Sequence, residues 1–208
     1  MKLETIYNKL VEIIKDDMNF QKALKLKEEL EQSIRQETCY KTTSKTRVNA
    51  IKKVASKWED RPALTGYGII DDFKCVTDSY HAIMIHEENM PLKLVTTDKE
   101  LADKVGHENC INATYPDLRR AMEFNKDDYN LIELNYDDIA QFYKLHSKNA
   151  KDELYEINGK FYNIIYLKNV IDVLGTNLKV YQHDDLTRPL FLENENGELG
   201  LVLGIRKY

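Results

Sequence analysis

Apolar residues recur at helical spacing near the start of the chain, first between residues 3 and 15 and again between residues 20 and 36. Each set falls on one face of a helix, and only a short polar break separates the two sets. Helices joined by so short a break pack antiparallel. The pattern therefore predicts a helical hairpin over residues 1–40, and its mixed charges favour packing or self-association over a chemical role.

The next segment changes character, because every charged residue between positions 41 and 57 is basic. A helix from about Thr46 to Trp58 would place a row of apolar residues on one side, namely Val48, Ile51, Val54, Ala55 and Trp58. Its other side would carry Lys52, Lys53 and Lys57. Such a basic amphipathic helix can lie along phosphates without reading bases, although a merely solvated helix face explains the same pattern.

Short runs of strand-forming residues follow, each bounded by turn residues. Residues 64–70, 73–77 and 81–86 form three such runs, with two aspartates at the first turn. A further strand leads into a helix capped by Thr97 or Asp98. These runs predict a middle segment rich in strands.

The last third of the chain is also a mixture of helix and strand. An Asn-Gly pair at residues 158–159 predicts one hairpin, and a second pair at 196–197 predicts another between the runs RPLFLEN and ELGLVLGI. Between them, an amphipathic helix should end at Gly175, where a left-handed cap is needed. This order of elements predicts an α+β fold whose final residues form a strand.

Composition limits the possible partners. The 208 residues are 42% hydrophobic and carry a net charge of −5, so any contact with nucleic acid must come from local charge. No apolar run approaches the ~20 residues of a membrane span, and the N-terminus lacks a signal-peptide pattern, so we expect a cytoplasmic protein. Cys39, Cys75 and Cys110 are scattered without a CxxC pair and favour reduced thiols over a disulfide framework or a zinc site.

Catalytic motifs are missing from the sequence, which contains no HExxH, GxSxG, Walker A or GxGxxG pattern. His81 and His86 are five residues apart on a predicted strand, so their side chains should point to opposite faces. Adjacent aspartate pairs fall mostly at predicted turns, where turn and cap chemistry explains them without a metal. We predict no catalytic residue, no metal site and no cofactor.

Three separated segments resemble the bacterial DNA polymerase III sliding clamps. The run RPALTG followed by VTDSYH resembles the middle domain of that family, which has a similar Thr-Asp-Gly-His-Arg-Leu run. Here Thr77 and Asp78 are kept, but the glycine and arginine are not. The run YPDLRR resembles the segment that joins the middle domain to the last one, and LVLGIR resembles the end of the family's chain. The resemblance covers residues 44–208.

The resemblance implies DNA-clamp-like antiparallel sheets with helices on one face, divided into a middle-domain region (41–122) and a C-terminal domain (123–208). It also implies an apolar cleft that binds short hydrophobic peptides of replication proteins. Carried over position by position, that cleft comprises Leu64, Thr77, Tyr80, His81, Pro116, Ala121, Leu203, Gly204, Ile205 and Arg206. Ordinary sheet core is the plainer explanation for its apolar members. Gly204 replaces a proline typical of the family, and Ala82 replaces a larger apolar residue.

The resemblance further implies that helices line the inner side of an arc around double-stranded DNA. The candidate phosphate contacts are Lys45, Arg47, Lys52, Lys53 and Lys57. We therefore predict a non-catalytic, DNA-associated scaffold or processivity factor that binds partner peptides and forms a homo-oligomer. The alternative is a protein-interaction adaptor or inhibitor that keeps a clamp-like fold and does not bind DNA.

Overall fold

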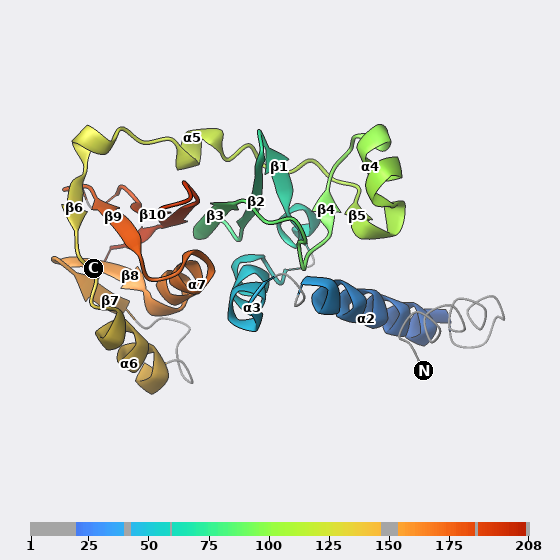
Figure 1. Ribbon diagram of the computed structural model, residues 1–208, viewed down its shortest axis with the longest axis horizontal. Coiled ribbons are helices and arrows are strands. Elements are labelled where there is room, and N and C mark those ends of the chain that lie inside the picture. The colour runs from blue at the N-terminus through green and yellow to red at the C-terminus, as the bar shows by residue number, and fades with distance from the viewer. Residues whose placement is uncertain (1–19, 40–42, 59, 147–153, 186, 207–208) are drawn as a thin grey trace.

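Figure 1 shows the computed structural model of the protein, which describes residues 20–39, 43–58, 60–146, 154–185 and 187–206. The described helices are α2 (Phe20–Cys39), α3 (Lys45–Val54), α4 (Lys99–Val105), α5 (Arg119–Met122), α6 (Tyr136–His146) and α7 (Ile164–Leu174). The strands are β1 (Gly68–Ile70), β2 (Phe73–Thr77), β3 (His81–Ile85), β4 (Leu94–Val95), β5 (Cys110–Ile111), β6 (Asn130–Ile132), β7 (Leu154–Ile157), β8 (Lys160–Asn163), β9 (Leu178–Gln182), β10 (Leu190–Asn194), β11 (Leu199–Val202) and β12 (Gly204–Ile205). These elements confirm the predicted α+β class.

A seven-stranded antiparallel sheet forms the centre of the molecule, in the order β1-β2-β3-β11-β10-β9-β6. Strand β3 pairs with β11, so that Ala82 lies opposite Leu201. This pairing joins three strands from residues 68–85 to four strands from residues 130–202. The sheet therefore crosses the boundary at residue 122 that we placed between the two clamp-like regions.

Helices α3 and α7 pack side by side against one face of this sheet (Figure 1). Val48, Ile51 and Val54 of α3 are buried, as its apolar pattern predicts. Gly200 of β11 lies beneath α7, and a Cβ at this position would be only 2.2 Å from Cγ1 of Val170. Glycine is required here because any side chain would push the helix off the sheet.

The opposite face of the sheet is covered by a connector that runs from Tyr115 to Tyr129 and includes α5 (Figure 1). Leu118 and Met122 of the connector share a buried cluster with Phe191 of the sheet. Phe124 stacks on Phe191 with the ring centroids 4.0 Å apart. The sheet thus has an apolar core on each face, with its two central helices on one face as predicted.

The chain leaves the large sheet at Leu203. Strand β11 ends at Val202, and the Leu203 backbone N–H donates to the Tyr80 carbonyl at 3.0 Å. Gly204 and Ile205 then pair with β8 in a three-stranded sheet of order β12-β8-β7. The single strand predicted at the end of the chain is therefore two strands that belong to two sheets.

The predicted N-terminal hairpin is represented by its second helix, α2. Its first helix, predicted at residues 3–15, lies outside the described residues. The α2 helix contacts the ends of the two-stranded β4–β5 sheet. Glu31 forms an ion pair with Lys93 at 3.7 Å, and the Arg35 guanidinium donates to Asn109 at 2.7 Å.

The predicted strand at residues 64–70 is shorter than expected. Residues Pro62–Leu64 form a 3-10 turn, and the Thr65 N–H donates to the Pro62 carbonyl at 3.1 Å. Proline is favoured at the first position of such a turn because its φ is already fixed. The strand begins only at Gly68.

The basic helix also ends earlier than predicted, at Val54 rather than Trp58. The Ser56 N–H donates to the Leu64 carbonyl at 2.9 Å instead of to a carbonyl one turn back in the helix. The chain therefore turns away from the core after Ala55. Trp58, which we expected on the buried side, is 55% exposed.

Both Asn-Gly pairs mark hairpins, but with different loops. At 158–159 both residues have positive φ (48° and 77°), as a two-residue type I′ turn requires. At 196–197 only the glycine has a positive φ, of 74°. The Asn194 N–H donates to the Glu198 carbonyl at 3.1 Å, so this loop has three residues rather than the two expected.

Two of the predicted helix ends are confirmed. The Asp98 carboxylate accepts the backbone N–H groups of Glu100 and Leu101, at 2.9 and 3.2 Å, and so caps α4. Gly175 ends α7 with a φ of 93°. Asn135 caps α6, because its side chain accepts the Asp138 N–H at 3.1 Å.

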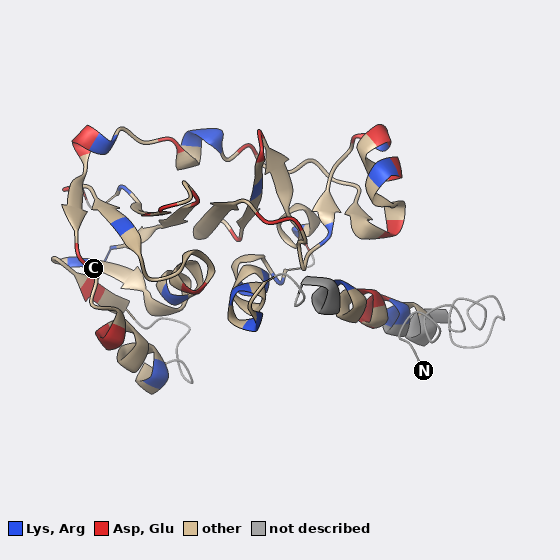
Figure 2. Ribbon diagram, in the orientation of Figure 1, with Lys and Arg blue, Asp and Glu red and all other residues tan. Residues whose placement is uncertain are grey.

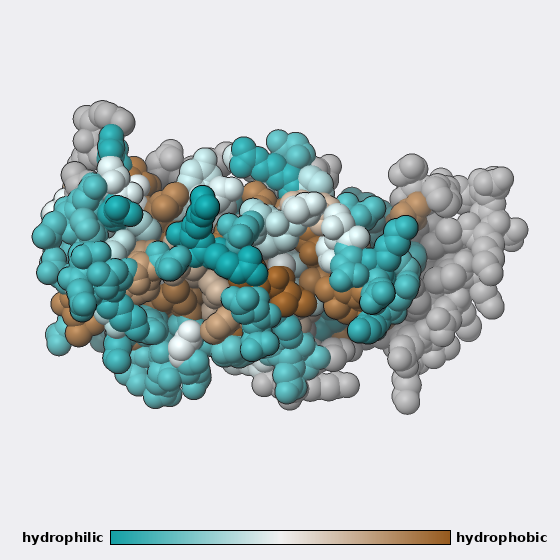
Figure 3. Space-filling view, turned by 90° about the horizontal axis from the view of Figure 1, so that it is seen from above, coloured by the Kyte–Doolittle hydropathy of each residue, from teal (hydrophilic) through white to brown (hydrophobic). Residues whose placement is uncertain are grey.

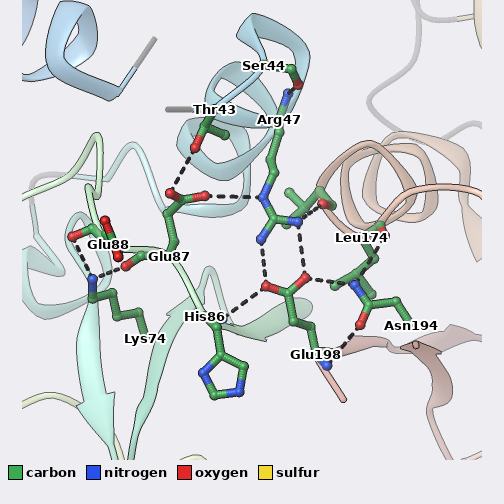
Figure 4. Close-up of polar contacts among 11 residues, drawn as sticks. Thr43, Ser44, Arg47, Lys74, His86, Glu87, Glu88, Leu174, Asn194 and Glu198 are labelled. Carbon is green, nitrogen blue, oxygen red and sulfur yellow. Dashed lines mark hydrogen bonds and ion pairs between the residues drawn. The ribbon is translucent and has the colours of Figure 1, made fainter. Parts of the chain in front are cut away.

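A buried ion pair ties α3 to the sheet (Figure 4). The Arg47 guanidinium donates twice to the Glu198 carboxylate, at 2.7 and 3.1 Å, and once to Glu87 at 3.3 Å. It also donates to the Val173 carbonyl of α7. The Asn194 amide donates to the same Glu198 carboxylate at 2.7 Å. Because Glu198 is only 3% exposed, these charge-assisted bonds lie largely out of water.

Replacing Glu198 with Ala should leave the Arg47 charge buried without its main partner. We expect the free energy of unfolding to fall by about 3–5 kcal/mol, the usual cost of breaking a buried pair from one side. Urea denaturation followed by circular dichroism measures this loss. Glu195→Ala, on an exposed residue of the same loop, is the matched control and should cost less than about 0.5 kcal/mol. Equal losses in the two variants would contradict a structural role for the pair.

Candidate functional site

A cavity of about 1200 Å³ opens between the connector and the sheet. Residues 61–64, 77–82, 114–123 and 187–191 supply most of its wall. Figure 3 views the molecule from the connector side and shows apolar surface in the middle of this face, bordered by hydrophilic residues. Segments far apart in the sequence therefore converge on one depression.

The cavity wall is mostly apolar with a few polar groups. Its apolar members include Leu64, Pro116, Leu118, Ala121, Phe191, Leu201 and Leu203. Its polar members include Thr77, His81, Arg120 and Arg188. Binding sites for small ligands and for extended peptides have this composition, because apolar contact supplies affinity and the few polar groups fix orientation.

A tight turn from Thr77 to His81 shapes one side of the cavity. Ser79 has a φ of 85°, which residues other than glycine rarely adopt, and it stands where the similar run of the clamps has glycine. The Asp78 carboxylate holds the turn by accepting the backbone N–H groups of Tyr80 and His81 at 2.9 and 3.0 Å. The Thr77 hydroxyl donates to the His81 carbonyl at 2.8 Å.

His81 is buried in this turn, with 1% of its surface exposed. Its Nδ1 lies 2.8 Å from Oδ1 of Asp78, and its ring stacks on Tyr166 of α7 at a centroid distance of 4.4 Å. Burial alone would raise the pKa of Asp78, but hydrogen bonds from the His81 ring and from two backbone N–H groups outweigh burial and hold this pKa below its usual range. His81 Nε2 is buried and has no hydrogen-bond partner among the described residues, and the stacking on Tyr166 places the ring on the α7 side of the sheet.

Six of the ten residues predicted for the peptide cleft line this cavity: Leu64, Thr77, His81, Pro116, Ala121 and Leu203. Tyr80, Gly204, Ile205 and Arg206 do not. The Tyr80 ring stacks with Tyr166 at 5.9 Å instead. The last three residues leave the cavity because the chain changes sheets after Leu203.

Several wall residues were not singled out from the sequence: Tyr115, Leu118, Tyr129, Arg188, Phe191 and Leu201. Tyr115 and Leu118 belong to the YPDLRR run, so that motif already contained their signal. The loop before β10 carried no such signal, because its residues indicate only a turn between two strands. Its approach to the connector is set by tertiary packing.

The lysines of the basic segment remain on the outside of the molecule. Lys45, Lys53 and Lys57 are exposed and Lys52 is half-buried, and this burial lowers the pKa of Lys52. Figure 2 marks basic residues along α3. They form a positive surface on a protein whose net charge is negative.

Arg47 differs from these lysines because its charge is already paired inside the protein. Burial alone would lower its pKa, but the hydrogen bonds and negative charges of Glu198 and Glu87 raise it above the ordinary value. We therefore leave Arg47 out of the candidate DNA surface. Its sequence position on a basic helix gave no sign of these partners.

Other chemistry has little support within the described part of the chain. No group of three or more His, Cys, Asp and Glu side chains there could hold a metal ion. Burial raises the pKa of the Cys75 thiol to about 12, so it is not a reactive nucleophile. None of the described helices has the length and apolarity to cross a membrane.

Comparison with known proteins gives structural relatives. No protein-family model and no curated protein matches the sequence. Among solved structures, the beta subunit of Streptococcus pyogenes DNA polymerase matches with a TM-score of 0.52 at 12% identity, over 85% of this chain and 64% of that one. The Bartonella birtlesii sliding clamp, bound to griselimycin, gives 0.51 at 15% identity, over 78% and 64%. The Bacillus subtilis sliding clamp gives 0.50 at 13% identity, over 78% and 62%.

The chain spans less than two thirds of the length of these clamps. At such low identities the match establishes architecture, and function has to be argued from the site. The chain therefore has a clamp-like fold, divergent in sequence from the bacterial DNA polymerase III sliding clamps that it resembles.

Proposed function

We propose that the protein is a non-catalytic, DNA-associated scaffold that holds a partner peptide in the cavity and double-stranded DNA against α3. One observation carries this proposal. The cavity is walled by the core on the connector side of the sheet, whereas the lysines belong to the helix on the other side. Two ligands can therefore bind at once, as tethering a partner to DNA requires.

The cavity suits an extended peptide with neighbouring apolar side chains. Leu64, Leu118 and Leu203 offer apolar contact from three separate segments. Arg120 and Arg188 offer polar contacts at the wall. A few such anchors supply most of the affinity of a peptide.

Leu203 and Ile205 provide a matched test, because each is 37% exposed but only Leu203 lines the cavity. Leu203→Ser should weaken binding of a labelled Leu- and Phe-containing pentapeptide by about tenfold or more, since burying a leucine contributes about 1.5–3 kcal/mol. Fluorescence anisotropy measures the affinity.

Ile205→Ser is the control and should leave peptide affinity unchanged. If both variants bind the peptide as the unchanged protein does, the cavity is not the peptide site. If only Ile205→Ser weakens binding, the site lies at the three-stranded sheet.

The α3 surface suits non-specific contact with DNA phosphates. Lys45, Lys52, Lys53 and Lys57 lie on or just beyond one short helix, and no acid lies between them in the sequence. If all of them contact phosphates, the logarithm of the affinity should fall with the logarithm of salt concentration at a slope of about −3.6, since each contact contributes about −0.9.

Reversing two of these charges, Lys53→Glu with Lys57→Glu, should reduce that slope by about 1.8 because two phosphate contacts are lost. Titrations of duplex DNA at several salt concentrations measure the slope. Lys99→Glu with Lys104→Glu, on the exposed face of α4, makes the same change in net charge and is the control. Equal effects of the two pairs would contradict DNA contact at α3. An unchanged protein that binds no duplex DNA would favour the alternative function, an adaptor that does not bind DNA.

We further propose that the protein self-associates through its sheet edges. Strands β1 and β6 end the seven-stranded sheet and expose Ile69 and Leu131. Leu131→Lys should lower the average molar mass at high concentration, because a charge on an edge strand opposes pairing. Sedimentation equilibrium measures this mass. A single-chain mass for the unchanged protein at every concentration would contradict self-association.

A further inference from the structure

A second, smaller cavity lies just beyond the C-terminal end of α3. It has a volume of about 200 Å³ and is lined by Trp58, Tyr80 and Tyr166 together with Lys53 and Lys57. Trp58 is 55% exposed and Tyr80 is 49% exposed. Exposed apolar groups that gather on one surface often mark a binding site. The two proposed binding surfaces described above do not use these rings.

The aromatic rings are held in place before any ligand arrives. Tyr80 and Tyr166 stack nearly parallel, at 9° and 5.9 Å between centroids, and Tyr166 stacks in turn on the buried ring of His81. The Arg61 guanidinium lies 5.4 Å from the centroid of the Trp58 ring. Rings fixed in this way lose little conformational entropy when a flat ligand stacks on them.

The charge around the rings is favourable for an anionic ligand. Lys53 and Lys57 are exposed, and neither forms an ion pair with any described residue. Asp78 also lines the cavity, and its Oδ1 accepts from two backbone N–H groups and lies 2.8 Å from the His81 ring. Because two lysines stand against this one carboxylate, positive charge prevails at the rim.

We infer that this cluster binds unpaired bases of single-stranded DNA, with Trp58 and Tyr80 as stacking surfaces and Lys53 and Lys57 as phosphate contacts. Surfaces that bind single strands combine these two features, because every base has a flat face and every nucleotide has a phosphate. Duplex DNA cannot use the rings, since its base faces are covered by their neighbours. The inference rests on the proposed contact of α3 with DNA and extends it to the boundary between duplex and single strand.

Trp58 is the one tryptophan of the chain, so its fluorescence reports on this cluster alone. Titration of the full-length protein with the single strand (dT)20 should quench the Trp58 emission, and a blunt duplex should not. Anisotropy should show a duplex with a single-stranded extension binding about tenfold more tightly than the blunt duplex, because its unpaired bases can stack on the exposed rings.

Trp58→Ala and Tyr80→Ala should each abolish this preference and leave the affinity for blunt duplex unchanged. Trp58→Phe should keep part of the preference, because phenylalanine still stacks. Leu145→Ala, at a 77% exposed apolar residue of α6, is the control and should have no effect. Both aromatic side chains are exposed, so these variants should fold.

The outcomes separate this inference from the proposed function. Unchanged Trp58 emission on binding of (dT)20, or equal affinities for the extended and blunt duplexes, overturns the inference alone. Quenching by (dT)20 without any binding of blunt duplex supports the single-strand site and contradicts the duplex function. If no DNA binds and a protein partner quenches Trp58 instead, the cluster is a protein-binding surface and the inference is wrong.

Discussion

The pairing of β3 with β11 is the contact on which the rest of the structure depends. It places Ala82 opposite Leu201 and so brings the end of the chain beside its middle. The same pairing places Leu203, which lines the larger cavity, beside the Tyr80 carbonyl. A register shift of one residue would turn the side chains of one strand to the other face of the sheet. The cavity wall would then be disrupted, and α7 could no longer pack closely over Gly200.

The two faces of the sheet also present different surfaces. The connector side combines apolar walls with Thr77, Arg120 and Arg188, and the helical side presents lysines to solvent. The Arg47–Glu198 ion pair fixes α3 on the sheet, because Glu198 lies in the loop between β10 and β11. Arg47 also donates to the Val173 carbonyl of α7. One basic residue is thereby removed from the outer surface. Because the net charge is −5, the remaining lysines have to act locally rather than through the field of the whole molecule.

Features fixed by neighbouring residues could be predicted from the sequence. The Asn158–Gly159 turn, the Asp98 cap and the end of α7 at Gly175 each depend on a few adjacent positions. Features fixed by distant contacts could not. The early end of α3 depends on a bond from Ser56 to Leu64, and the pairing of Arg47 depends on a carboxylate far along the chain. The sequence predicted part of the candidate cleft. The short motifs contain the residues at its centre, but the chain changes sheets after Leu203, so Gly204, Ile205 and Arg206 lie outside the cavity.

The central claim is that one sheet holds a peptide on one face and DNA on the other at the same time. The most direct test is the affinity for a blunt DNA duplex, measured by anisotropy with and without a saturating amount of the Leu- and Phe-containing peptide. If the sites are separate, the two affinities agree and a complex of all three components forms. If the peptide displaces the DNA, the two ligands compete for one surface and the claim is wrong.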